Sequence, residues 1–87
     1  MHAEGAGESE AALALHREAA ERWAGYGYVL GQASSLFGAG RCLLALGRPF
    51  EAASPLTDAR ELFKSLGATP SVERVDETLA RATSVSA

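Results

Sequence analysis

The feature of this sequence that most restricts its fold is an apolar pattern that occurs twice. The first copy reads Ala12-x3-His16-x2-Ala19-x3-Trp23-x3-Gly27, and the second, offset by 52 − 12 = 40 residues, reads Ala52-x3-Leu56-x2-Ala59-x3-Phe63-x3-Gly67. Steps of four and three residues place the matched side chains on one face of an α-helix. A weaker likeness joins Gly40-Arg41 to Ala80-Arg81. The sequence therefore predicts helices that alternate between two types and stack as pairs.

Four helices are expected from this periodicity and from the residues that interrupt it. Their predicted ranges are 9–24, 28–46, 49–66 and 69–83, so that one helical domain spans 9–84 between a disordered start at 1–8 and a tail at 85–87. Ser9 is expected to cap the first helix. Thr69 is expected to cap the fourth, with a proline after it. Glycines end the others because glycine adopts conformations that a helix cannot use. The predicted fold class is all-α, an antiparallel array of helical hairpins.

Three residues inside the predicted helices are unusual there. Gly38 and Gly40 each lower intrinsic helix stability by about 1 kcal/mol, so we expect them to let a neighbouring helix come close. Pro55 lies within a clean apolar stripe, yet proline removes a backbone hydrogen bond. Either helix 49–66 bends at Pro55, or a shorter helix begins there with Ser54 as its cap.

Part of the pattern resembles a known family. The segment Ala33-x2-Leu36-x2-Ala39-Gly40-x2-Leu43-x3-Gly47-x4-Ala52-x3-Leu56-x2-Ala59 is similar to one tetratricopeptide repeat, with Gly40 at the close-packing position of its first helix. The string GRCLLALGRPFEAASPLTDARELFKSLGATP is also similar to C-terminal repeats of large actinobacterial ATP-binding regulators of the LuxR and cyclase-associated types. The period of 40 departs from the usual value of about 34, and Leu66-Gly67 stands where the repeat has its terminal proline. The resemblance implies one full repeat flanked by two half-repeats.

The same resemblance implies a concave partner groove lined by the first helix of each pair. The residues expected to face it are Phe37, Arg41 and Leu44 from 28–46, and Arg74, Glu77 and Arg81 from 69–83. Arginines beside apolar groups can hold an acidic or C-terminal peptide through bidentate hydrogen bonds. The plainer interpretation is that they are solvated helix charges with acidic neighbours such as Glu73 and Asp76. The chain contains none of the asparagines that the family uses to clamp a peptide carboxylate.

The remaining composition narrows the class of function. A net charge of −3 argues against binding held mainly by phosphate contacts. The segment SPLTDARELFKSLGATPSVERVDETLARA superficially resembles a helix-turn-helix with Gly67 at the turn, but its second helix carries Glu73, Asp76 and Glu77 beside its arginines. His16 occupies the position of Leu56 in the other copy, so core packing is expected of it. No set of acid, base and nucleophile and no metal spacing is evident, so we expect no enzyme, no cofactor and no metal.

These observations favour a non-catalytic protein-interaction module, the C-terminal repeat segment of a larger signalling or transcriptional regulator. Its partner would be a protein or peptide, with an acidic one favoured by the arginines, and neither nucleic acid nor membrane. The alternative is a self-associating helical unit, a homodimer or a fragment stabilised by its parent chain, because fewer than three repeats are rarely stable alone. The faces expected to lack cover carry Trp23, Val72, Val75 and Leu79. A single cysteine and no secretory signal or spanning segment predict a cytoplasmic setting.

Overall fold

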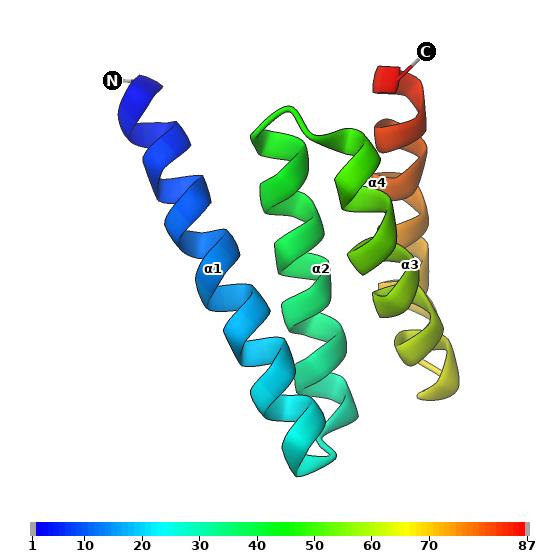
Figure 1. Cartoon of the computed structure of the whole chain (residues 1–87). Coiled ribbons are helices and arrows are strands. Elements are labelled where there is room, and N and C mark those ends of the chain that lie inside the picture. Colours follow the sequence, from blue (N-terminus) through cyan, green and yellow to red (C-terminus); the bar gives the residue numbers. More distant parts are fainter. Residues whose placement is uncertain (1, 87) are drawn as a thin grey trace.

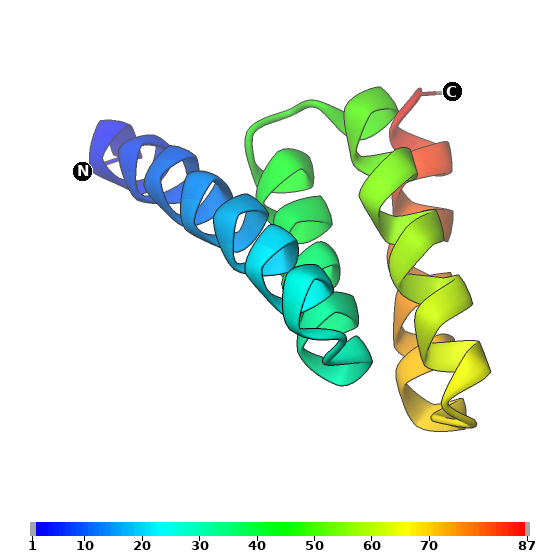
Figure 2. The same ribbon diagram turned by 60° about the horizontal axis from the view of Figure 1, so that its bottom comes forward.

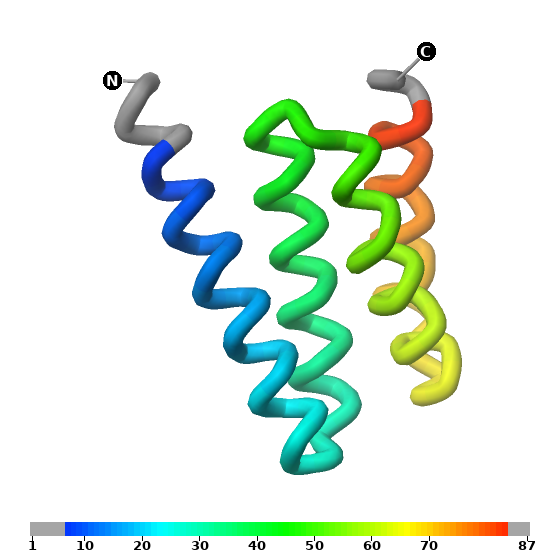
Figure 3. Tube along the Cα trace, viewed as in Figure 1, coloured from blue at the N-terminus to red at the C-terminus, as the bar shows by residue number. Residues whose placement is uncertain are grey.

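The computed structural model describes residues 2–86, with side chains at residues 7–83 (Figure 3). It consists of α1 (His2–Tyr26), α2 (Val29–Ala45), α3 (Pro49–Ser65) and α4 (Thr69–Ser86). Each helix runs antiparallel to the one before it and packs against it, and α4 also meets α2 (Figure 1). No strand occurs among residues 2–86. The predicted all-α antiparallel array of four helices is confirmed.

The same turn joins every pair of consecutive helices. It contains Gly27, Gly47 or Gly67, with φ angles of 76°, 75° and 71°, at intervals of 47 − 27 = 67 − 47 = 20 residues. After α2, the Gly47 amide donates to the Leu44 carbonyl at 3.0 Å, and the Arg48 amide donates to the Leu43 carbonyl at 2.8 Å. This pattern satisfies the last carbonyls of a helix and needs a left-handed residue, for which glycine is best suited. Helices of similar length therefore return alongside one another.

The core nests large side chains against small ones. Leu43, Leu56 and Val75 are the largest completely buried side chains, and Ala33, Ala39, Ala52 and Ala59 are buried between them. A Cβ atom placed on Gly40 would lie 2.5 Å from Cγ of Leu56 on α3, and one placed on Gly38 would lie 2.5 Å from Cε1 of His16 on α1. The two glycines therefore admit neighbouring helices on either side of α2, as predicted. Figure 2 shows α2 between α1 and the α3–α4 pair.

The helix ends differ from the prediction mainly at α1 and α4. Ser9 was expected to cap the first helix, but α1 begins at His2, so Ser9 lies within the helix and that prediction is wrong. Residues 1–8 were expected to be disordered, but the backbone is helical from residue 2. Alanine and glutamate in this segment favour helix. Thr69 belongs to α4 and does not cap it, and α4 reaches Ser86 inside the expected tail at 85–87. Met1 and Ala87 lie outside the described residues.

Pro55 lies inside one continuous helix, so of the two alternatives for this segment the long helix is correct. The residues around it explain the choice. Ala52, Leu56 and Ala59 are all completely buried on one face of α3, and a shorter helix starting at Pro55 would lose the first of these contacts. Burial of that stripe outweighs the loss of one backbone hydrogen bond, which amounts to about 3 kcal/mol inside a helix.

The two copies of the repeated pattern are not buried alike. In α3 the stripe from Ala52 to Phe63 is buried because α2 packs on one side of it and α4 on the other. α1 packs on α2 alone, and its buried residues are Leu13 and Ala20. The stripe predicted to be buried in α1 is half-buried or exposed: Ala12, His16, Ala19 and Trp23. One edge of the apolar face of α1 is thus turned away from α2.

Candidate functional site

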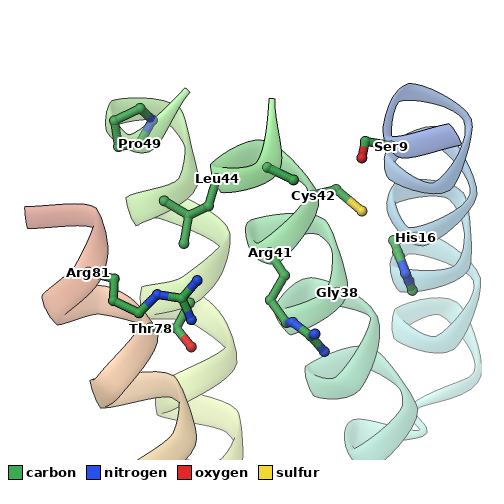
Figure 4. A pocket seen from close by; sticks show the side chains of 10 residues that line it. Ser9, His16, Gly38, Arg41, Cys42, Leu44, Pro49, Thr78 and Arg81 are labelled. Atoms are coloured by element: carbon green, nitrogen blue, oxygen red, sulfur yellow. The ribbon is translucent and has the colours of Figure 1, made fainter. Parts of the chain in front are cut away.

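A hollow of about 480 Å³ opens between α1, α2 and α4 (Figure 4). It lies toward the end of the molecule where α1 diverges from α2 (Figures 1 and 2). We call it the arginine hollow, because Arg41 from α2 and Arg81 from α4 both extend along it. Its lining also includes Ser9 and His16 from α1, Gly38, Cys42, Leu44 and Ala45 from α2, Pro49 from α3 and Thr78 from α4.

The side chains that line the arginine hollow are set by helical spacing. On α4, Arg74, Thr78 and Arg81 follow one another at steps of four and three, which places them along one side of the helix. The Thr78 hydroxyl donates a hydrogen bond to the Arg74 carbonyl at 2.9 Å, so its proton is not available to a ligand in the hollow. On α2, the guanidinium carbon of Arg41 lies 5.7 Å from the centre of the Phe37 ring, within cation–π range.

A smaller hollow of about 150 Å³ continues the site between α2 and α4. Its lining includes Phe37 and Arg74, with Leu30, Ser34, Phe63 and Ser71. Arg41 lines the arginine hollow and Phe37 lines the smaller one, so the two hollows border each other at this contact. Each of the five residues predicted for the groove lines one hollow or the other. The arginine hollow is lined by Arg41, Leu44 and Arg81, and the smaller one by Phe37 and Arg74. Glu77 was expected with them, but it lines neither and is exposed.

The arginines of the groove are not held in ion pairs by the described side chains, although Glu77 lies three residues after Arg74 and four before Arg81 on α4. Among the side chains at 7–83, no carboxylate lies within 4.0 Å of Arg41, Arg74 or Arg81. Asp76 was weighed as a neighbour of Arg74, but it accepts a hydrogen bond from Nε of Arg60 on α3. That hydrogen bond and the charge of Asp76 raise the pKa of Arg60 above its usual range. The groove thus keeps a positive charge in a chain whose formal net charge is −3.

Two further side chains of chemical interest border the arginine hollow. His16 is half-buried and packs against Gly38, and Cys42 is half-buried one helical turn further along α2. No group of three or more His, Cys, Asp or Glu residues in the described part of the chain is arranged to hold a metal ion. The groups that the hollow offers a ligand are therefore chiefly guanidinium donors and apolar surface.

The residues predicted for self-association are placed differently from one another. Trp23 is 36% exposed, and its ring meets the ring of Tyr28 edge-on, with 5.1 Å between the ring centroids. Val72 and Leu79 are half-buried against the core. Val75 is completely buried, so the expectation that it lacks cover is wrong: α3 packs over this side of α4. Among the helices described in residues 2–86, none combines the length and hydropathy needed to cross a bilayer.

A hollow of about 390 Å³ on the outer side of α1 was not anticipated. Its lining consists of Leu15, Glu18, Ala19, Arg22, Trp23 and Tyr26. The 40-residue repeat could have indicated this hollow. It matches Leu15 and Tyr26 of α1 to Pro55 and Leu66 of the second copy, and so extends the apolar pattern of α1 to these two residues.

Comparisons of the chain with models of known protein families, with curated proteins and with solved structures give no match.

Proposed function

We propose that the chain is a non-catalytic protein-interaction module whose groove between α2 and α4 binds an acidic peptide segment. The observation that carries the proposal is that Arg41 and Arg81, on two different helices, share one hollow and have no carboxylate partner among the side chains at 7–83. A carboxylate seated between two guanidinium groups accepts charge-assisted hydrogen bonds from both, which are about twice as strong as neutral ones. Leu44 and Phe37 supply apolar contact beside it.

The spacing of the arginines suggests what such a peptide looks like. Arg74 and Arg81 are seven residues apart on α4, which is about 10 Å along the helix at 1.5 Å per residue. An extended peptide advances about 3.3 Å per residue, so its acidic groups would stand about three residues apart. The arginine hollow holds a side chain or a chain terminus, within the range of about 300–1,000 Å³ typical of ligand sites. We therefore favour an extended peptide with two acidic groups in acid-x-x-acid spacing.

We also propose a wider setting for this module. The repeated hairpins and glycine turns support a tetratricopeptide-like repeat, and the resemblance in sequence supports a role in an actinobacterial signalling or transcriptional regulator, working in the cytoplasm. Any ATPase or DNA-binding part of such a regulator would lie outside this chain. We rank nucleic acid below an acidic peptide, because a phosphate backbone is held by an excess of basic residues, whereas the formal net charge of this chain is −3.

The proposal is tested by fluorescence anisotropy with a labelled extended peptide. The probe carries glutamate at two positions three residues apart and a free terminal carboxylate, and its control has glutamine at both positions and an amidated end. We expect saturable binding of the acidic probe only, weakened by salt. Arg41→Glu and Arg81→Glu should each weaken binding by at least about tenfold, as expected when a close charge pair is reversed.

Arg17→Glu is the matched control variant. Arg17 is exposed on α1, makes no ion pair among the side chains at 7–83, and lines neither hollow of the groove. It changes the net charge of the chain as the groove variants do, so it should leave the anisotropy curve almost unchanged. Equal losses from all three variants would point to unspecific attraction of charge. Equal binding of the acidic and the neutral probe would contradict the proposed role of the arginines.

A further inference from the structure

The outer side of α1 carries an apolar surface that the described side chains leave largely open, apart from Trp23, which packs in part against Tyr28 and Gly31. Its members are Leu15, Ala19, Trp23 and Tyr26, which we call the α1 patch. Leu15 is 65% exposed, Tyr26 is 78% exposed and Trp23 is 36% exposed. The patch forms one wall of the hollow of about 390 Å³, which is bordered by Glu18 and Arg22. Large apolar side chains gathered in this way on one face commonly mark an interaction surface.

The internal repeat shows what kind of element fits this surface. Residues 15, 19, 23 and 26 correspond to residues 55, 59, 63 and 66 of α3. On α3, Asp58 and Leu62 lie on the same side as Pro55 and Leu66, at steps of three and four residues. They share a hollow with Leu36, so this side of α3 borders α2. The other side borders α4, where Arg60 and Lys64 share a hollow with Val72. Each side of α3 is thus covered by a helix.

α1 has only one of these two neighbours. Its buried residues Leu13 and Ala20 correspond to positions 53 and 60, the side on which α3 receives the helix that follows it. The α1 patch is therefore the side on which a preceding helix would pack. Its shape matches that requirement, because small Ala19 lies between the larger Leu15 and Trp23, leaving room for a helix to approach.

We propose that a second copy of this chain covers the patch, with the two α1 helices packed antiparallel about a twofold axis near Ala19. In that arrangement Ala19 lies on the partner's Ala19, because 19 + 19 = 38. Leu15 then faces the partner's Trp23, since 15 + 23 gives the same sum. Tyr26 reaches beyond the partner's patch and meets the partner's Ala12, since 26 + 12 = 38. Large residues thus meet different residues across the axis, and the surface is complementary to itself, as a closed twofold interface requires.

The charges at the border of the patch fit the same axis. Glu18 and Arg22 form an ion pair within α1 at 3.9 Å, with side chains 64% and 73% exposed. The sum 18 + 22 = 40 exceeds 38 by two residues, an offset of about 3 Å along the helix. Antiparallel pairing therefore brings Arg22 within reach of the partner's Glu18, and each arginine gains a second carboxylate. Packing α4 of a second copy on the patch is less favourable, because α4 carries Glu73 and Asp76 where α2 carries Ala33 and Leu36.

The extent of the patch indicates how strong the pairing is. A whole aromatic side chain buries about 150–250 Å², so the uncovered parts of Trp23 and Tyr26 amount to about 250 Å² per copy. A standard stable interface buries about 800 Å² per partner. Leu15 and Ala19 add to the patch without closing this gap. We therefore expect a weak dimer, populated in the micromolar to millimolar range. The patch shares no residue with the two hollows of the groove.

Sedimentation equilibrium over that concentration range tests the proposal. The apparent mass should rise with concentration from 9.0 kDa toward twice this value. Leu15→Glu should weaken dimerisation by at least about tenfold, as loss of a central apolar contact does. Because Leu15 is mostly exposed, circular dichroism should show unchanged helicity. Phe50→Glu is the matched control, since Phe50 on α3 is 91% exposed and lies outside the patch; it should leave the mass curve unchanged.

A charge exchange tests the twofold axis itself. Arg22→Glu alone should weaken the dimer, because it places like charges opposite each other, whereas Glu18→Arg combined with Arg22→Glu should restore it. Ala19→Cys, in a Cys42→Ser background, should give a disulfide-linked dimer on mild oxidation, and Arg17→Cys should not. A mass that stays at 9.0 kDa at millimolar concentration would overturn the proposal. So would equal weakening by Phe50→Glu, or failure of the double charge exchange to restore what the single change removes.

Discussion

Replacing Gly40 with alanine tests the close approach of α2 and α3. Two effects of opposite sign compete. Alanine favours helix over glycine by about 0.5–1 kcal/mol. Against this, the new methyl group would lie 2.5 Å from both Cγ and Cδ2 of Leu56. Leu56 is completely buried, and its Cγ is only two bonds from the backbone, so it cannot turn away. Overpacking of a tight core destabilises by about 1–3 kcal/mol.

We therefore expect Gly40→Ala to lower the free energy of unfolding by about 1 kcal/mol net. For a domain of this size that is a fall in Tm of about 4–8 °C. Urea denaturation followed by circular dichroism at 222 nm measures the change. Gly38→Ala is the matched control: its methyl group would meet the far end of the half-buried His16 ring, which can rotate into the arginine hollow. That variant should be neutral or more stable by up to about 1 kcal/mol.

A double variant isolates the contact. Leu56→Ala alone should destabilise strongly, by about 2–5 kcal/mol. Added to Leu56→Ala, the Gly40→Ala change should become neutral or stabilising, because its methyl group then enters the space that was vacated. A double-mutant cycle in which the two changes simply add would refute the account of helix nesting.

The remaining predictions concern single positions. Gly47→Ala should lower the free energy of unfolding by about 1 kcal/mol, measured by urea denaturation, because its φ of 75° strains a side chain while nothing crowds its Cβ. Phe50→Ser should change it by less than about 0.5 kcal/mol in the same assay, because Phe50 is almost fully exposed. Val75→Asp should abolish helicity by circular dichroism, because Val75 is completely buried and an unpaired carboxylate there costs several kcal/mol.

The helical array could be predicted from the sequence because its signals are local. The glycines at the turns, the apolar steps of four and three, and the small residues at 38 and 40 each have one straightforward structural explanation. The groove residues were expected from the resemblance to a helical repeat, in which the first helix of each pair lines one face. Arg41 and Arg81 occupy matching positions, 40 residues apart, on two such helices. In the structure both line one hollow, and its role as a binding groove stays a prediction.

What the sequence could not determine is which edge of a broad apolar face is covered. In α1 the apolar residues extend over more of the helix than α2 can contact, so the buried ones, Leu13 and Ala20, were not distinguishable from Ala12 and Ala19. Val75 shows the same difficulty in α4, where α3 covers a residue that was expected to be free. The start of α1 was missed because Ser9 resembles a cap even though the residues before it can continue the helix.

The central claim is that the groove binds an acidic peptide, and the most direct test is to map its contacts by amide chemical shifts. In ¹⁵N-labelled protein titrated with the acidic probe, the largest changes should occur at Phe37, Arg41 and Leu44 on α2 and at Arg74, Thr78 and Arg81 on α4. The outer side of α3 around Phe50 should be unaffected. Changes centred on the α1 patch, or changes spread evenly over the exposed cations of the chain, would contradict the claim.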